Sequence, residues 1–198
     1  MSGRPVAYLL THLTGAGATE LVGLYGMERA SGRGAVDVSP AAAAWKADLG
    51  AAADEAEATA PAGVVVERKG LATTLHYRLS PERSDWADRF AADQVVRRGV
   101  VAHPGKMSVE LRPPVSTDKG TVLAELSWGL QAVCFIGDDT GDLPAFSELA
   151  RLRAGGRATL AVAVESAETP RRLVEAADLV VDGPGGVARL LDTLADGP

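Results

Sequence analysis

Apolar and polar residues follow two different patterns along this chain. From residue 119 onward, short apolar runs alternate with amphipathic segments, which predicts strands and helices in strict succession. The expected helices span residues 119–130, 143–152, 170–176 (capped by Thr169) and 186–194. The expected strands span residues 132–136, 158–164 and 179–181. Such alternation is typical of βαβ units, so this part predicts a parallel sheet with right-handed crossovers.

The middle of the chain, residues 29–112, has a different pattern, in which pairs of strands are separated by helices. The glycine-rich residues 31–34 read as a linker, and the two prolines at 113–114 close the segment. The expected strands span residues 64–67, 71–77, 100–103 and 107–111, with turns at 69–70 and 104–105. The expected helices span residues 40–60 and 84–98, the second capped by Ser84. This pattern predicts a small α+β module inserted into another domain.

Residues 1–28 precede this module. They predict a helix over 6–13, a stop at 14–17 and a strand over 21–26. The whole chain is therefore expected to be an α/β protein. Its first core segment is 1–28, its inserted domain is 29–112 and its second core segment is 113–198.

Composition narrows the class of protein. The 198 residues are 46% hydrophobic and 23% charged, as in soluble globular proteins. A net charge of −6 disfavours nucleic acid and anionic membranes as partners. Residues 4–18 faintly imitate a signal peptide, but His12 interrupts the apolar run, so we interpret it as an amphipathic helix. No apolar run approaches a membrane span, and Cys134 is the only cysteine, which fits a reducing cytoplasm.

An acidic loop is the strongest candidate for chemistry. A short apolar run ends at Gly137, and Asp138, Asp139 and Asp142 follow. The run predicts a strand buried on both faces, which places the carboxylates at the carboxyl end of a parallel strand, where α/β sheets bind ligands. Three close carboxylates require solvation, protonation or a cation, and hard oxygen ligands favour Mg²⁺ over zinc. The alternative is a solvated acidic turn in which Asp142 caps the next helix.

Several short motifs, taken in order, resemble the trehalose-6-phosphate phosphatases of the haloacid dehalogenase superfamily. The resemblance covers essentially the whole chain, and it rests on the order and spacing of the motifs rather than on any one of them. The motifs are Ser2-Gly3-Arg4, Gly23-Leu24-Tyr25-Gly26-Met27-Glu28, Glu67-Arg68-Lys69-Gly70, His76-Tyr77-Arg78, His103-Pro104-Gly105-Lys106, Glu110-Leu111-Arg112-Pro113, Asp118-Lys119-Gly120 and Gly137-Asp138-Asp139.

The resemblance implies a partial Rossmann-like core with a parallel sheet, an inserted α+β cap domain and Mg²⁺-dependent hydrolysis of trehalose 6-phosphate to trehalose and phosphate. An aspartate nucleophile forms an aspartyl phosphate in these enzymes. By resemblance, Ser2, Gly3 and Arg4 contact the substrate, and the Ser2 hydroxyl and Gly3 amide hold its phosphate. Lys119 balances charge between phosphate and nucleophile. Two aspartates serve the metal: Asp138 as a ligand, and Asp142 as support for the metal or its waters.

The resemblance also implies a sugar site in the inserted domain, whose members are Glu67, Lys69, Arg78, Lys106 and Glu110. Alternation along a strand places Glu67 with Lys69 on one face, and Lys106 with Glu110 on one face. Charged groups form stronger hydrogen bonds with sugar hydroxyls than neutral groups do. The alternative is ordinary cross-strand ion pairing. We interpret His76 and His103 as structural.

The chain departs from the family pattern in two places. Its acidic loop has Gly141 and Leu143 where the family often has threonine and glutamate, a change that spares the three aspartates. The family's Asp-x-Asp-Gly-Thr motif, which carries the nucleophile, does not occur in the 198 residues and is expected upstream of Ser2. We therefore expect this chain alone to be inactive. The alternatives are a phosphatase for another sugar phosphate and a non-catalytic sugar-phosphate-binding fragment.

Overall fold

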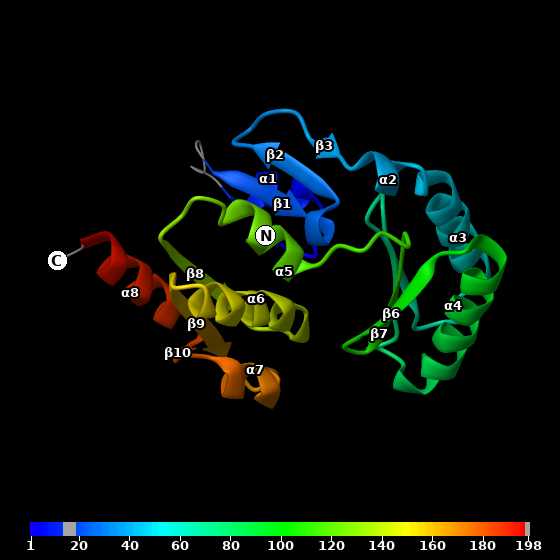
Figure 1. The fold of residues 1–198 in the computed structure, drawn as a ribbon. Coiled ribbons are helices and arrows are strands. Elements are labelled where there is room, and N and C mark those ends of the chain that lie inside the picture. Colours follow the sequence, from blue (N-terminus) through cyan, green and yellow to red (C-terminus); the bar gives the residue numbers. More distant parts are fainter. Residues whose placement is uncertain (14–18, 197–198) are drawn as a thin grey trace. The chain divides into compact units, whose positions relative to one another are not determined.

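The computed structural model describes residues 1–13 and 19–196 (Figure 1). The chain divides into two compact units, 1–116 and 117–198. The expected helix stop at 14–17 lies outside the described residues, as do the small residues of the signal-like segment. The finer division into core segments 1–28 and 113–198 around an insert 29–112 stays a prediction. None of the helices within the described residues is long and apolar enough to cross a membrane.

The unit 1–116 begins with a helix and a small antiparallel sheet. Strand β1 (Glu20–Gly23) pairs with β2 (Glu28–Ser31), which pairs with β3 (Asp37–Val38). Helix α1 (Val6–His12) precedes this sheet, and the short helical turn η1 (Leu24–Gly26) connects β1 to β2. The predicted linker 31–34 is therefore wrong, because these residues form the turn of a hairpin, with Gly32 at φ 58°. The strand expected over 21–26 ends at Gly23, since Leu24 and Tyr25 adopt left-handed φ angles of 47° and 58°.

The second sheet of this unit has four antiparallel strands in the order β4-β5-β7-β6. Their bounds are β4 Val65–Arg68, β5 Thr73–His76, β6 Val101–Gly105 and β7 Ser108–Arg112. Helices α3 (Lys46–Thr59) and α4 (Ser84–Arg98) cover one face (Figure 1). Leu49 of α3, Ala91 of α4 and Leu75 of β5 pack there in a buried cluster. One face is thus apolar, and strand alternation directs every second side chain to the other face.

The helix bounds, the helix cap and one turn of this unit differ more from the prediction than its strands do. The helix expected over 40–60 is broken at Trp45 into α2 (Pro40–Ala43) and α3. The turn between β6 and β7 lies at Lys106-Met107, with Met107 at φ 52°, rather than at 104–105. Pro104 remains in β6 because an edge strand tolerates a residue without an amide hydrogen. The short turn η2 (Pro81–Arg83) leads into α4, and Ser84 is its first helical residue, without a side-chain cap.

The unit 117–198 alternates helices and strands, as predicted. Its parallel sheet has the order β10-β9-β8. The strands are β8 Ala132–Gly137, β9 Ala158–Glu165 and β10 Leu179–Asp182. The helices are α5 Lys119–Leu126, α6 Leu143–Ala154, α7 Arg171–Ala176 and α8 Gly183–Asp196, and the turn η3 spans Thr140–Asp142. Thr169 does not cap α7; its hydroxyl donates to the carbonyl of Val164.

Strand β8 differs from the prediction in its burial. Val133 and Phe135 are buried, and the Phe135 ring meets Phe146 of α6 edge to face, with centroids 6.3 Å apart. Cys134, on the opposite face, is exposed. In the described part of this unit β8 is an edge strand whose one face packs on α6, so it is not buried on both faces. Its carboxyl end nevertheless leads directly into the acidic loop, as expected.

Candidate functional site

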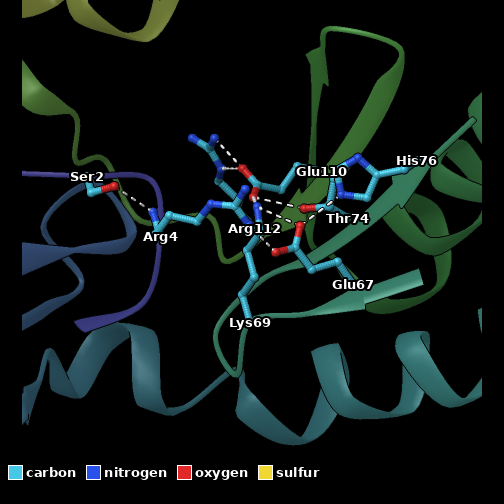
Figure 2. A network of polar contacts seen from close by, with 8 residues as sticks. All are labelled: Ser2, Arg4, Glu67, Lys69, Thr74, His76, Glu110 and Arg112. Atoms are coloured by element: carbon cyan, nitrogen blue, oxygen red, sulfur yellow. Dashed lines mark hydrogen bonds and ion pairs between the residues drawn. The ribbon is translucent and has the colours of Figure 1, made fainter. Parts of the chain in front are cut away.

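The polar face of the four-stranded sheet carries a row of four facing residues. Glu67 of β4 pairs with Thr74 of β5, Thr74 with Glu110 of β7, and Glu110 with His103 of β6. Residues that face one another across strands point to the same side of a sheet. The row therefore lies opposite the apolar face that α3 and α4 cover. Figure 2 shows the polar contacts of three members of this row, Glu67, Thr74 and Glu110, with their neighbours.

Glu110 is at the centre of these contacts and is only 5% exposed. Its Oε1 atom accepts hydrogen bonds from Lys69 Nζ at 2.6 Å and from the Thr74 hydroxyl at 3.0 Å. Its Oε2 atom accepts from Nε of Arg112, and Nη2 of the same guanidinium lies beside it (Figure 2). A carboxylate offers about four acceptor positions. Glu110 is therefore a buried anion whose acceptor positions are filled by two cations and a hydroxyl.

These cations determine the acidity of Glu110. Burial by itself raises the pKa of this carboxyl group, but the nearby charges of Arg112 and Lys69 outweigh that effect and hold its pKa below the usual range. A group whose pKa is lower in the folded state stabilises the fold above its unfolded pKa. That contribution is lost as the pH falls through the folded pKa.

We expect Glu110→Gln to destabilise the chain at pH 7, because Lys69 and Arg112 then lose their common anion. The difference in unfolding free energy between the wild type and the variant should shrink as the pH falls below 4.5, the ordinary value for glutamate. Urea unfolding at pH 7 and near pH 3.5 measures both differences. Glu165→Gln, at an exposed position at the end of β9, is the control. An equal difference at both pH values would contradict the linkage.

Glu67 forms a second anionic centre in the same group. Its Oε1 accepts from Arg4 Nη1 at 2.6 Å, and its Oε2 lies 2.8 Å from Nε2 of His76 and 3.6 Å from Lys69 Nζ (Figure 2). Burial raises the pKa of Glu67, but the His76 hydrogen bond and the Lys69 and Arg4 charges leave it lowered overall. We call this group, together with the contacts of Glu110, the sheet cluster; its members are Arg4, Glu67, Lys69, Thr74, His76, Glu110 and Arg112.

The start of the chain is held close to β1 and η1. The amide of Ser2 donates to the carbonyl of Val22 at 2.8 Å, and the Ser2 hydroxyl accepts from the amide of Arg4 at 3.0 Å. A Cβ atom at position 3 would lie 2.5 Å from the hydroxyl oxygen of Tyr25. A side chain at position 3 would therefore force the tyrosine ring to shift, and glycine allows the ring to pack closely on the backbone there. This arrangement places Arg4 where it reaches Glu67.

Four of the predicted site residues thus meet in the sheet cluster: Arg4, Glu67, Lys69 and Glu110. Arg78 and Lys106 lie at exposed positions after β5 and between β6 and β7. Three residues of the cluster were not predicted as site residues: Thr74, His76 and Arg112. Period-two alternation places His76 with Thr74, and Arg112 with Glu110, so the signal was present in the strand pattern. His76, interpreted as structural, contacts Glu67.

A second polar group is built around Asp142 in the unit 117–198. Asp142 is 2% exposed, and its Oδ2 atom accepts from the amides of Asp138 and Asp139, each at 3.0 Å. Its Oδ1 atom accepts from Nζ of Lys119. A Cβ atom at Gly137 would lie 2.5 Å from Cγ of Asp142, so only glycine fits there. Asp142 precedes α6 but does not cap it with its side chain, because its carboxylate holds the loop together instead.

Lys119 reaches Asp142 from the first turn of α5. Asp118 caps this helix, accepting from the amide of Thr121 at 2.8 Å, while the Thr121 hydroxyl accepts from the Asp118 amide at 3.0 Å. A Cβ atom at Gly120 would lie 2.6 Å from the carbonyl oxygen of Pro144, so glycine allows α5 and α6 to approach closely. The cap and the small residue together direct Lys119 toward the loop.

The acidic loop supplies only part of a cation site. Within residues 1–13 and 19–196, no group of three or more histidine, cysteine, aspartate or glutamate side chains is arranged to hold a metal ion. Both Asp142 oxygens already accept hydrogen bonds, and Asp139 accepts from the amide of Thr140 at 2.5 Å. The exposed Asp138 has the carboxylate best placed to take a cation. The loop by itself therefore does not fit a complete Mg²⁺ site.

Comparison with known proteins gives a consistent result. Residues 1–177 match the family described as trehalose-phosphatase. A protein of Sinorhizobium fredii (strain NBRC 101917 / NGR234) named "Probable trehalose-phosphate phosphatase" is 34% identical over 142 residues, which are 67% of this chain and 51% of that protein. The chain thus spans about half the length of this curated relative.

Solved structures share the fold. The C-terminal domain of C. albicans trehalose-6-phosphate phosphatase has a TM-score of 0.72 and 22% identity, over 99% of this chain and 77% of that chain. A haloacid dehalogenase-like hydrolase from Bacteroides thetaiotaomicron has a TM-score of 0.64 and 14% identity, over 97% of this chain and 84% of that chain. These likenesses confirm the predicted α/β fold class.

Proposed function

Since this chain belongs to the trehalose-phosphatase family, we propose that it carries the sugar-binding and charge-balancing residues of a phosphatase. The proposed reaction is the hydrolysis of trehalose 6-phosphate to trehalose and phosphate. The proposed partner is this small molecule alone, and not a nucleic acid or a membrane. The reducing cytoplasm is the proposed location, because the only cysteine, Cys134, has no second cysteine to pair with.

One observation supports this proposal most strongly: strands β4, β5 and β7 bring together the charged side chains of the sheet cluster on the face opposite α3 and α4. A face with both cationic donors and carboxylate acceptors suits a ligand rich in hydroxyl groups, since charge-assisted hydrogen bonds are the strong ones. Arg78 and Lys106 belong to this proposed sugar site through the family resemblance.

The phosphate end of the substrate is assigned by the same resemblance. Ser2 and Gly3 are the proposed phosphate contacts, with Arg4 beside them. Lys119 is the proposed cation that balances charge near the phosphate. Mg²⁺, when bound, would neutralise phosphoryl oxygens. Asp138 is proposed as a ligand, and Asp142 supports it by holding the Asp138 and Asp139 amides.

A non-catalytic role in sugar-phosphate binding is the second candidate. The observation that favours it is the sheet cluster itself, whose contacts join side chains within residues 4–112. Ligand binding at this cluster therefore needs no residue of the acidic loop. A phosphatase for a different sugar phosphate is distinguished by comparing phosphate release across a panel of sugar phosphates.

Glu110→Ala is expected to separate sugar recognition from chemistry. In a chain extended upstream by an Asp-x-Asp-Gly-Thr segment, we expect kcat/KM for trehalose 6-phosphate to fall by about 10²-fold, because Lys69 and Arg112 lose the anion that orients them. Turnover of a small generic phosphate ester should change less than about threefold, since such an ester has no sugar to recognise. Glu57→Ala is the matched control. Equal losses on both substrates would show that Glu110 is only structural.

A further inference from the structure

Two neighbouring groups, the Glu110 carboxylate and the Tyr25 ring, fix the orientation of the Arg112 side chain. It ends strand β7, and its side chain is 17% exposed. Nε and Nη2 of its guanidinium face the same oxygen of Glu110. Its Cζ atom lies 3.6 Å from the centroid of the Tyr25 ring, so the guanidinium stacks on the tyrosine. A planar cation with one edge on a carboxylate and one face on a ring has a single orientation.

Tyr25 itself is placed by an uncommon backbone. Its φ and ψ angles are 58° and 27°, and the preceding Leu24 has φ 47°. Bulky residues adopt this left-handed region rarely, and such strain concentrates at functional sites. The Tyr25 hydroxyl packs where Gly3 lacks a Cβ atom. The strained loop and Gly3 thus hold the ring on which Arg112 stacks.

The guanidinium has donors to spare. It carries five N–H groups, of which those on Nε and Nη2 are directed at Glu110. Within the described part of the chain, no side-chain nitrogen or oxygen is both buried and without a hydrogen-bond partner. The Nη1 group of Arg112 takes no part in the contacts to Glu110, so it is available to donate a hydrogen bond to an oxygen atom of a ligand. Glu110, in contrast, has its acceptor positions filled.

We propose that Arg112 is a ligand-binding residue of the sheet cluster, a planar donor that Tyr25 positions to hydrogen-bond an oxygen of a hydroxyl-rich ligand. The inference rests on the proposed sugar-binding function and adds a residue to it. Glu110 then acts as the anchor of Arg112 and Lys69, and these two cations are the groups that donate to the ligand. The mixed charges of the cluster favour a neutral polyhydroxylated portion of the ligand over its phosphate.

The test measures trehalose binding to the 198-residue chain by calorimetry, with inorganic phosphate as the second probe. Arg112→Lys keeps the charge but loses the planar fork, and it should weaken trehalose binding at least about tenfold while leaving phosphate binding unchanged. Tyr25→Leu removes the ring on which Arg112 stacks, and it should also weaken trehalose binding. Glu57→Gln, on the exposed surface of α3 and outside the sheet cluster, is the control and should bind trehalose within about twofold of the wild type.

A second measurement needs no substitution. In the wild-type chain, the side-chain ¹⁵N resonances of Arg112 should shift when trehalose is added, and should not shift with phosphate alone. Unchanged Arg112 resonances during saturation with trehalose would overturn the proposal, as would full trehalose affinity in Arg112→Lys. Shifts with phosphate alone would assign Arg112 to the phosphate instead and overturn it too.

Other binding results would show that the proposed function itself is wrong. If the wild type binds another disaccharide and not trehalose, the substrate assignment is wrong, and the same variants with that disaccharide decide the role of Arg112. If the wild type binds no sugar in a panel of mono- and disaccharides, both the sugar site and the role of Arg112 are wrong.

Discussion

The 198-residue chain should release no phosphate from trehalose 6-phosphate above the uncatalysed background, with or without Mg²⁺. Hydrolysis in this family requires a carboxylate nucleophile in line with phosphorus, and positioning supplies a large part of the rate. The acidic loop offers no substitute. Asp142 is buried and bound to Lys119 and two amides, and Asp139 is occupied with the Thr140 amide. Only Asp138 is left, and it is the proposed cation ligand.

A chain extended upstream by a segment with Asp-x-Asp-Gly-Thr should regain Mg²⁺-dependent turnover. In that chain, Asp138→Asn and Lys119→Ala should each lower kcat by about 10²-fold or more, the usual loss when one group that stabilises transition-state charge is removed. Glu175→Gln, in an exposed pair on α7, should leave kcat unchanged. Phosphate release is the assay for both chain lengths. Robust Mg²⁺-dependent turnover by the short chain would falsify the claim that the nucleophile is missing.

Asp142→Asn is expected to have the largest effect on stability, a loss of about 3–5 kcal/mol of unfolding free energy. Removing one partner of a buried ion pair leaves the other charge buried without compensation. Lys119 is 13% exposed and Asp142 is 2% exposed at their side chains, so the lysine cannot recover full solvation in place. The asparagine can still accept from the Asp138 and Asp139 amides, which confines the change to the ion pair. Urea unfolding at pH 7 measures the loss.

Two further variants distinguish the loss of the Lys119–Asp142 ion pair from a general disruption of the loop. Adding Lys119→Met to Asp142→Asn removes the buried charge, and it should restore part of the lost stability. Glu175→Gln breaks an exposed pair with Arg171 and should change stability by less than about 0.5 kcal/mol. If Asp142→Asn costs no more than Glu175→Gln, the Lys119–Asp142 pair does not hold the loop.

The sequence by itself determined the kinds of element and the faces of the strands. Apolar periodicity is a local property, and it correctly predicted the parallel sheet β8 to β10 and the four strands β4 to β7. The alternation of side chains along a strand placed Glu67 and Lys69 on the same face. The predicted Lys69-Gly70 turn was confirmed, with Gly70 at φ 77°. The motifs added the family, because their order along the chain is specific even where each one is short.

Only the tertiary structure decided how the polar groups use their hydrogen-bonding capacity. Lys69 and Glu110 are 41 positions apart and Lys119 and Asp142 are 23 apart, so no local pattern reports that they meet. The sequence predicted a metal-supporting residue and a helix cap at Asp142. In the structure, both of its carboxylate oxygens accept hydrogen bonds from Lys119 and the loop amides. The burial of one face of β8 and the stacking of Arg112 on Tyr25 were equally hidden, because long-range packing determines both.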